Sequence, residues 1–210
     1  WHFLPEAGIT MDDSTKTTST NIDGVNIKVI PVTPVEYTSS KIKQGYYSEG
    51  QGSISNADYT EYEQNTTGTA VFNTVLLPVG VGENLDATAA EVEVSGKEKS
   101  EASAYELFIQ DNNRNKTERY IYYLLHDRSA KSTVTVGGFT TDASMMMIQL
   151  SEDGTPIHFA AQDASFIKMN SDIVYQNDTE IAELSVKRSG QICEINGTGL
   201  NSSDLAESKF

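Results

Sequence analysis

Residues 145–161 read MMMIQLSEDGTPIHFAA, and this stretch decides the fold class. Apolar residues fill both ends of it, and Asp153-Gly154 lies between them. An Asp-Gly pair between two apolar runs is a strong signal for a tight turn that joins antiparallel strands. The stretch therefore predicts a β-hairpin made of residues 146–150 and 157–161.

The same alternation between turn residues recurs along the chain. Residues 25–29 (VNIKV) and 90–94 (AEVEV) alternate apolar with polar side chains, a period of two that is typical of half-buried strands. Residues 120–125 (YIYYLL) and 145–148 (MMMI) are apolar at every position. Those two runs predict central strands that are covered on both faces.

Helix signals are scarce between these runs. The strand starts recur at intervals that suit a sandwich better than alternating strands and helices. The sequence therefore predicts an all-β fold, an antiparallel β-sandwich with two large sheets of long strands, over residues 1–200. Residues 201–210 are expected to form a tail or the start of a linker.

Charge limits the partners that the chain can bind. It carries 30 acidic and 15 basic residues, which gives a net charge of −15. A surface this acidic repels phosphate backbones, so we expect no nucleic-acid partner and no anionic membrane surface. No apolar run approaches the roughly 18 residues of a spanning helix, so no membrane insertion is expected. Screening confines the repulsion to roughly 8–10 Å, so a local basic cleft could still hold an anionic polymer.

Residues that could support catalysis or bind a metal are sparse. His2, His126 and His158 form no closely spaced pair, so each is expected to be a structural histidine rather than a metal ligand. Cys193 is the single cysteine, and the alternation around it predicts a buried structural thiol. The sequence contains no nucleophile elbow, phosphate loop or dinucleotide motif. We therefore assign no catalytic residue, no metal site and no cofactor to this chain.

Tyrosines cluster beside glycines in residues 45–52 (GYYSEGQG). Tyr46 and Tyr47 lie in this segment, and Tyr59 follows it. Exposed tyrosines can stack on sugar rings, so these three residues are the candidate carbohydrate-binding residues. Tyrosines are also ordinary core and cross-strand partners in sheets, and this alternative stays open.

Four segments carry a resemblance to a known family. They are residues 1–5 (WHFLP), 22–29 (IDGVNIKV), 45–52 (GYYSEGQG) and 70–78 (AVFNTVLLP). In their order and spacing they resemble strands of the C-terminal β-sandwich region of the heparinase II/III-like polysaccharide lyases. The resemblance covers residues 1–95 and becomes a generic strand pattern after that.

The resemblance implies a two-part bacterial enzyme, secreted or at the cell surface, in which an N-terminal helical toroid of the same polypeptide precedes the sandwich. Such enzymes cleave acidic polysaccharides by β-elimination beside uronic acids. The family's catalytic Tyr and its Asn or His come from the toroid, and its histidine-rich sandwich segment has no match here. We therefore expect this chain to be a fragment or a processed product, without lyase activity of its own.

Two other interpretations remain open. The chain could be a non-catalytic carbohydrate-binding module, or a structural sandwich at a cell surface with no sugar involved. If strands of the sandwich are missing from the chain, its exposed sheet edges would favour a homodimer.

Overall fold

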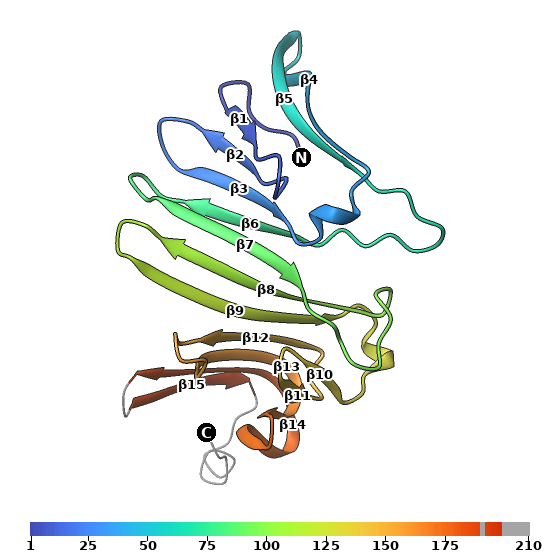
Figure 1. Ribbon diagram of the computed structural model, residues 1–210, viewed down its shortest axis with the longest axis vertical. Helices are drawn as coiled ribbons and strands as arrows, with labels where there is room; N and C mark the ends of the chain where they lie inside the picture. The colour runs from blue at the N-terminus through green and yellow to red at the C-terminus, as the bar shows by residue number, and fades with distance from the viewer. Residues whose placement is uncertain (190–191, 199–210) are drawn as a thin grey trace. The chain divides into compact units, whose positions relative to one another are not determined.

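The computed structural model describes residues 1–189 and 192–198 (Figure 1). The protein is all-β and antiparallel, with 62% of the described residues in strands, so the predicted fold class is confirmed at this level. Within the described ranges the helical segments are two 3-10 turns, η1 (Pro34–Glu36) and η2 (Arg128–Ala130), and no helix is long and apolar enough to cross a membrane. The tail expected at residues 201–210 lies outside the described residues.

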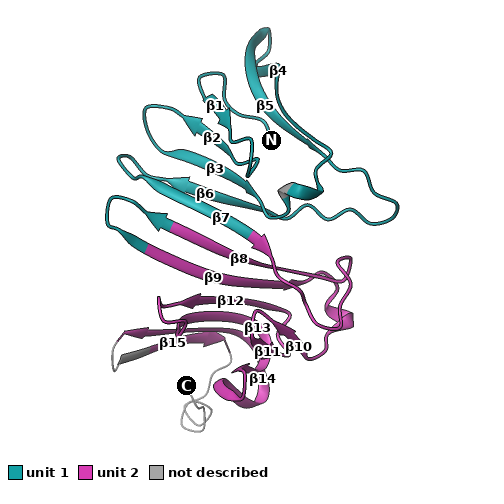
Figure 2. Ribbon diagram, in the orientation of Figure 1, with its two compact units in different colours: residues 1–89, 110–116 teal, residues 90–109, 117–210 magenta. Residues whose placement is uncertain are grey.

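The chain forms two compact units (Figure 2). Unit 1 comprises residues 1–89 and 110–116, and unit 2 comprises residues 90–109 and the chain from residue 117 onward. The chain passes from unit 1 to unit 2 within β7 (Leu85–Glu91). It returns to unit 1 for the turn that joins β8 (Ala102–Asp111) to β9 (Lys116–Leu125).

Unit 1 contains a four-stranded sheet with the strand order β1-β2-β3-β6. These strands are β1 (Gly8–Met11), β2 (Thr18–Asn21), β3 (Asn26–Pro31) and β6 (Thr74–Val79). Thr18 of β2 pairs with Val29 of β3, and both residues are buried. The face of the sheet that carries them is therefore covered by other parts of unit 1.

A long hairpin lies against this face. It consists of β4 (Ser39–Gly50) and β5 (Ser53–Glu63). The Tyr62 hydroxyl of β5 donates a hydrogen bond to the Lys16 carbonyl at 2.8 Å, and Thr18 Oγ1 lies 2.8 Å from the same Tyr62 oxygen. These contacts tie the hairpin to the four-stranded sheet.

The first three residues of the chain pair with the outer edge of β5. The Thr60 amide donates to the Trp1 carbonyl at 2.9 Å, and the Phe3 amide donates to the Asp58 carbonyl at 3.3 Å. His2 lies opposite Tyr59 in this antiparallel bridge. Residues 1–3 thus extend the hairpin by one short strand and bring the Trp1 side chain beside β5.

Apart from β7, which pairs with β8 in the same sheet, the remaining strands lie mostly in unit 2 and form a strongly curled sheet. They are β8, β9, β10 (Val134–Val136), β11 (Phe139–Thr141), β12 (Met145–Leu150), β13 (Pro156–Met169), β14 (Asp172–Ser189) and β15 (Ile192–Thr198). β14 pairs with one edge of β13, whereas β12 and β11 pair with successive halves of its other edge. β12 and β13 form the hairpin that the Asp153-Gly154 turn predicted.

A bulge bends β13 between its two halves. The register with β14 shifts between Ala164 and Phe166, and the preceding Asp163 has a positive φ of 51°. Asp142 accepts hydrogen bonds from the Ser165 amide at 2.9 Å, the Ser165 hydroxyl at 2.6 Å and the Phe166 amide at 3.2 Å. One carboxylate therefore satisfies the backbone donors that the bulge removes from the strand ladder.

The hydrophobic core of unit 2 lies on one face of the curled sheet. Ile121, Tyr123, Met146 and Ile148 are each at most 2% exposed within it. Past β7, residues 92–94 connect β8 to β10. The Val92 amide donates to the Ala104 carbonyl of β8, and Val94 forms a bridge with Val136 of β10. The alternation of buried and outward residues along β9 and β12 supplies the side chains of this core.

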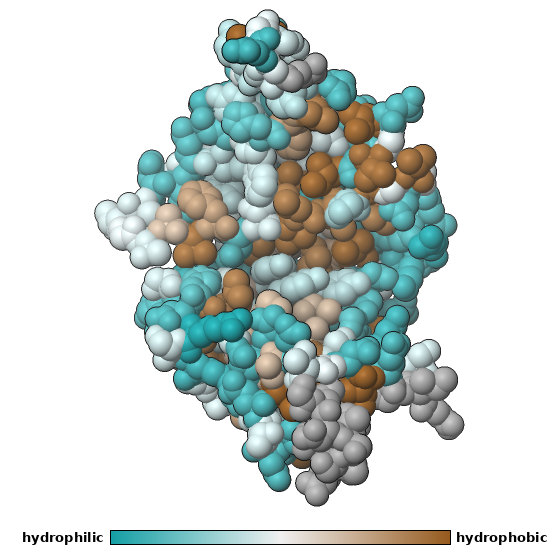
Figure 3. Space-filling model, turned by 180° about the vertical axis from the view of Figure 1, so that it is seen from behind, coloured by the Kyte–Doolittle hydropathy of each residue, from teal (hydrophilic) through white to brown (hydrophobic). Residues whose placement is uncertain are grey.

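The prediction that residues 120–125 and 145–148 are covered on both faces is wrong. Leu124 is 48% exposed and Met145 is 36% exposed, although their neighbours in the strands are buried. Residues 120–125 are apolar or aromatic throughout because tyrosine rings also stack on the outward face. The Tyr105 and Tyr122 rings stack at 4.9 Å, and Tyr120 lies 6.1 Å from Tyr122. Leu124 and Met145 therefore present apolar surface to solvent. Figure 3 shows hydrophobic residues exposed among hydrophilic ones on one face of the molecule.

Gly137 and Gly138 form the two-residue turn between β10 and β11. Both have positive φ, at 56° and 86°, which is the conformation of a tight hairpin turn that favours glycine. A Cβ added to Gly137 would lie 2.8 Å from Ile121 Cδ1, whereas a Cβ added to Gly138 would meet open space. The two positions therefore share the backbone constraint and differ in steric contact with the core.

Gly137→Ala should destabilise unit 2 more than Gly138→Ala. Both substitutions should cost roughly 1–2 kcal/mol for the left-handed backbone, and Gly137→Ala should add the displacement of Ile121. Chemical denaturation followed by circular dichroism measures the two free energies of unfolding. Equal losses in the two variants would show that Ile121 yields to the added methyl group without cost.

His158 of β13 provides a pH-dependent contribution to stability. Its Nε2 lies 3.1 Å from the Ser185 hydroxyl, and it pairs in register with Lys187 of β14. Burial lowers the pKa of His158, and the nearby Lys187 ammonium lowers it further. The folded state thus holds a neutral imidazole at a pH where the unfolded chain already binds a proton.

His158→Gln should reduce the loss of stability in mildly acidic solution. Because the pKa is lowered in the folded state, the wild-type chain should lose stability as the pH falls below about 6.5, the ordinary histidine value. The difference in melting temperature between about pH 7.5 and about pH 5.5 should be smaller in the variant. Parallel pH profiles for the two proteins would contradict this role of His158.

Candidate functional site

The three tyrosines predicted to bind carbohydrate all lie in the β4–β5 hairpin. Tyr46 and Tyr47 are neighbours on β4, so they point to opposite faces of the hairpin. Tyr47 pairs with Ser55, whereas Tyr59 pairs with Lys43, which separates Tyr47 from Tyr59 by four residues, or roughly 13 Å, along one face. The structure therefore does not bring the three rings together in one platform.

Tyr46 and Tyr59 differ in their surroundings. Tyr46 is 78% exposed. The Tyr59 ring stacks on the His2 imidazole, with ring centres 4.9 Å apart and planes 14° apart. Gly45 of β4 lies beside the same ring. A Cβ added at Gly45 would lie 3.1 Å from the Tyr59 ring, so the absence of a side chain at Gly45 leaves room for the Tyr59 ring. Tyr59 is thus held by its neighbours, and Tyr46 projects into solvent.

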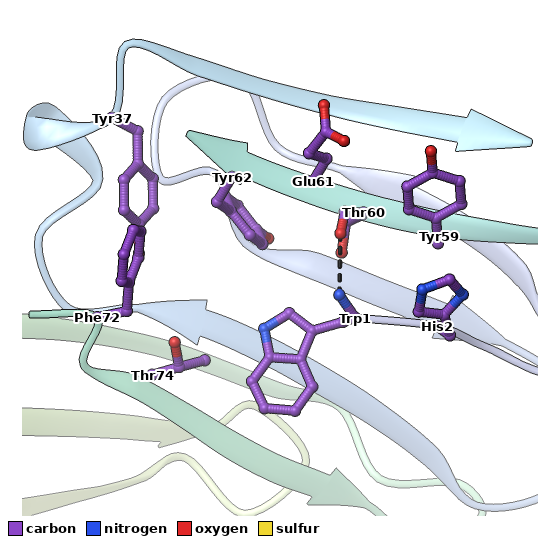
Figure 4. A pocket seen from close by; sticks show the side chains of 9 residues that line it. All are labelled: Trp1, His2, Tyr37, Tyr59, Thr60, Glu61, Tyr62, Phe72 and Thr74. Atoms are coloured by element: carbon purple, nitrogen blue, oxygen red, sulfur yellow. Dashed lines mark hydrogen bonds between the residues drawn. The ribbon is translucent and has the colours of Figure 1, made fainter. Parts of the chain in front are cut away.

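A cleft of about 600 Å³ opens in unit 1 between β5, the start of β6 and the first residues of the chain (Figure 4). Aromatic rings dominate its lining: Trp1, His2, Tyr37, Tyr59, Tyr62 and Phe72. Thr60, Glu61 and Thr74 complete the lining. We call this site the aromatic cleft, and it contains one of the three predicted tyrosines, Tyr59.

The rings of the aromatic cleft support one another. Tyr37 stacks on Phe72, with ring centres 6.0 Å apart and planes 23° apart, and it lies 5.1 Å from the tilted Tyr62 ring. Trp1 is 49% exposed and Phe72 is 51% exposed, so both present ring surface to solvent. Such half-exposed, braced rings can stack on a flat or weakly polar ligand without large rearrangement.

The Tyr37 and Tyr62 phenols of the aromatic cleft are poorly suited to act as bases. Burial raises the pKa of Tyr62, and burial together with Tyr62 and Glu36 raises that of Tyr37. Both phenols are therefore neutral at physiological pH and can donate hydrogen bonds rather than act as bases. The Tyr62 hydroxyl already donates to Lys16, which leaves it without a free proton for chemistry.

The acidic residue of the lining, Glu61, is paired with Lys43 across the hairpin. The side chains are 33% and 40% exposed, respectively. The bond from Lys43 lowers the pKa of Glu61, and the same bond raises the pKa of Lys43. The pair is therefore fully charged near neutral pH, and each charge compensates the other.

Comparison with known proteins identifies no relative. The chain matches no protein-family model, and no curated protein is significantly similar to it. The function is therefore argued from the aromatic cleft and from the segments that form it.

The histidines make local contacts at separate places. His126 contacts the Ser100 carbonyl at 3.0 Å and the Ser103 hydroxyl at 3.1 Å, while His158 contacts Ser185. Within the described part of the chain, no group of three or more His, Cys, Asp or Glu side chains could hold a metal ion. Cys193 lies in β15 opposite Arg188, and its side chain is outside the described part.

Sequence reasoning missed Trp1, Tyr37, Tyr62 and Phe72 as members of one site. Alternation along β5 does place Tyr62 on the same face as Thr60, and that signal was available. Tyr37 follows a 3-10 turn and Phe72 precedes β6, so neither lies in a periodic segment. Only the tertiary arrangement brings these two rings together.

Proposed function

We propose that this chain is the C-terminal β-sandwich region of a heparinase II/III-like polysaccharide lyase and that it contacts the polysaccharide without supplying catalytic residues. The observation that carries the proposal is the aromatic cleft, which combines half-exposed rings with hydroxyl groups in one open site. Pyranose rings present flat faces of C–H groups with hydroxyls at the edge. Aromatic stacking and hydroxyl hydrogen bonds are the interactions that such a ligand needs.

The segments that resemble the lyase family support this proposal because all four lie in unit 1. Residues 1–5 and 70–78 supply Trp1, His2, Phe72 and Thr74 to the cleft lining. Residues 22–29 and 70–78 overlap β3 and β6, which pair with each other. Two of the four segments that resemble one family region thus contribute to the aromatic cleft.

The two-sheet sandwich is part of the same proposal. In unit 1 the β4–β5 hairpin lies against one face of the four-stranded sheet, and Tyr62 links the two. Two β-layers that share a buried face form the elementary unit of a sandwich. We assign the sandwich interpretation to this part of unit 1, whereas unit 2 is a curled sheet around its own core.

The parent enzyme would supply the chemistry. β-Elimination needs a base beside the proton next to the carboxylate and a group that neutralises the developing charge. The neutral phenols of the aromatic cleft do not meet the first requirement. In the proposed parent, a secreted or cell-surface bacterial protein, the helical toroid provides the base and the acidic polysaccharide lies between the toroid and the sandwich.

A stand-alone carbohydrate-binding module is the second candidate. One observation favours it: every residue that lines the aromatic cleft belongs to unit 1, so the cleft is complete without a further domain. Both candidates predict sugar binding by this chain and no catalysis by it. They differ in whether a catalytic domain shares the polypeptide.

The full chain of 210 residues should release no unsaturated uronide from acidic polysaccharides. The ultraviolet absorbance of the conjugated double bond formed by β-elimination measures this, with an active lyase as the positive control. The reason is that, in the family that the chain resembles, the catalytic Tyr and its Asn or His come from the helical toroid. Product formation by the purified chain would overturn the assignment of catalysis to the parent alone.

Carbohydrate binding should change the fluorescence of Trp1, because the chain has a single tryptophan and it lines the aromatic cleft. Phe72→Ala should weaken binding about fivefold, which corresponds to roughly 1 kcal/mol for one lost stacking contact. Tyr46→Ala is the matched control, since it removes an exposed aromatic ring outside the cleft, and its affinity should equal that of the wild type. Loss of binding with Tyr46→Ala alone would move the site to the hairpin tip. No binding to a broad panel of glycans would favour a structural role.

A further inference from the structure

A serine and a histidine of unit 2 form a hydrogen-bonded pair that has no part in the aromatic cleft. The hydroxyl of Ser103 in β8 lies 3.1 Å from Nε2 of His126, which follows the end of β9. The other ring nitrogen of His126, Nδ1, lies 3.0 Å from the Ser100 carbonyl. All three residues belong to unit 2, so the arrangement is complete within one unit.

The Ser100 carbonyl fixes the tautomer of the His126 ring. A carbonyl oxygen only accepts hydrogen bonds, so Nδ1 carries the proton of this contact. In the neutral ring Nε2 then holds a lone pair, which accepts the proton of the Ser103 hydroxyl. A nucleophile bonded to a base, with the base oriented by a third group, is the arrangement that activates a serine for acyl transfer.

The Ser103 side chain lies on the outward face of the sheet. Its neighbours in β8, Ala102 and Ala104, are buried in the core, so alternation directs Ser103 away from the core. Ser103 is partly exposed and lines a pocket of about 240 Å³, and His126 is exposed. Because sites for drug-sized ligands occupy roughly 300–1,000 Å³, this pocket suits a short acyl group.

The acidic side chains of this pocket lie on the same face as Ser103. In residues 91–94 the two valines contact the core, so alternation directs Glu91 and Glu93 outward. Lys99 also lines the pocket and bonds to Glu91 at 2.7 Å. Part of the negative charge beside Ser103 is therefore compensated within the pocket.

A second lysine, Lys97, completes the charged lining of the pocket. The lining thus holds two acidic and two basic side chains, which suits an uncharged substrate. The Lys97 ammonium donates to the Ala130 carbonyl at 2.5 Å. An ammonium has three N–H donors, so Lys97 can also donate to the oxygen of a reacting ester, where negative charge develops.

We propose that Ser103 and His126 form a serine–histidine dyad that hydrolyses esters of short, uncharged carboxylic acids. Ser103 Oγ attacks the ester carbonyl carbon while its proton passes to His126 Nε2. The bond from that carbon to the alcohol oxygen then breaks, and the alcohol leaves with the proton. Water attacks the acyl-serine, gives a proton to Nε2 and releases the carboxylic acid as the serine regains its proton. This activity is separate from β-elimination and from the proposed carbohydrate contact.

His158 and Ser185 provide a matched comparison in the same chain. Their Nε2–Oγ distance is also 3.1 Å. Burial and the Lys187 ammonium lower the pKa of His158, which makes its ring a weaker base. The two pairs therefore separate the effect of a serine–histidine hydrogen bond alone from that of an exposed base beside a pocket.

Covalent labelling of the full chain tests the dyad directly. A small alkyl fluorophosphonate reacts with an activated serine by forming an oxygen–phosphorus bond and releasing fluoride, and peptide mass spectrometry locates the label. The wild-type chain should be labelled at Ser103 and not at Ser185. Ser103→Ala should leave the chain unlabelled. His126→Gln should slow labelling at least about 100-fold, because a positioned general base typically contributes that much.

Hydrolysis of p-nitrophenyl acetate measures turnover, followed by the absorbance of the released nitrophenolate. Ser103→Ala and His126→Gln should each reduce the rate to that of the uncatalysed reaction. Lys97→Met should lower kcat about tenfold with little change in KM, because the ammonium acts on the developing oxyanion. Ser185→Ala is the matched control and should keep the wild-type rate.

The wild-type labelling decides the proposal without relying on any variant. A wild-type chain that remains unlabelled would overturn the dyad, and so would label spread over several serines without preference for Ser103. Equal turnover by the wild type and Ser103→Ala would overturn it as well. Each of these results would leave the carbohydrate contact standing, because the aromatic cleft lies in unit 1.

Discussion

The hydrogen bond from the Tyr62 hydroxyl to the Lys16 carbonyl joins the two β-layers of unit 1 beside the aromatic cleft. It ties the β4–β5 hairpin to the four-stranded sheet, and Thr18 contacts the same oxygen from a fully buried position. The Tyr62 ring also braces Tyr37, which in turn stacks on Phe72. The aromatic cleft therefore depends on a polar contact made at its base.

Unit 2 rests on a different constraint, the sorting of side chains between the two faces of a curled sheet. The inward residues of β9 and β12 build the core, while the outward tyrosines stack on one another across strands. Burial raises the pKa of Tyr105 to about 12, which keeps the outward ladder uncharged over the physiological range. Apolar and aromatic residues thus make stabilising contacts on both faces of the sheet, although only the inward face is buried.

The presence of apolar residues on both faces of the curled sheet explains which parts of the fold could be predicted from the sequence. The turn chemistry of Asp153-Gly154 and the alternation of residues 25–29 are local signals that correspond to the β12–β13 hairpin and to β3. Of residues 90–94, only the first two lie in a strand, at the end of β7, and Val94 forms an isolated bridge. The prediction that residues 120–125 are covered on both faces was wrong because stacked outward tyrosines produce the same composition as two buried faces. The bend in β13 depends on Asp142, which is distant in sequence from the bulge that it stabilises.

The aromatic cleft could not be predicted from local sequence patterns for a related reason. Its rings come from positions 1, 2, 37, 59, 62 and 72, and of these only Tyr59 and Tyr62 lie in a regular strand with a readable period. The GYYSEGQG segment predicted a site at Tyr46 and Tyr47, but neighbouring residues of a strand point to opposite faces. Of the four segments quoted for the family resemblance, residues 1–5 and 70–78 contribute to the cleft lining, whereas residues 22–29 and 45–52 do not.

The Asp142 carboxylate has an evolutionary consequence. It serves three donors on residues 165 and 166, so a bend in the backbone has become dependent on one side chain that lies 23 positions away from Ser165. Loss of the acid would leave two backbone amides at the bulge without their acceptor, and a change at Ser165 would leave the acid with fewer donors. Among descendants of this sequence, positions 142 and 165 should therefore change as a pair or persist as a pair, while nearby surface positions drift independently.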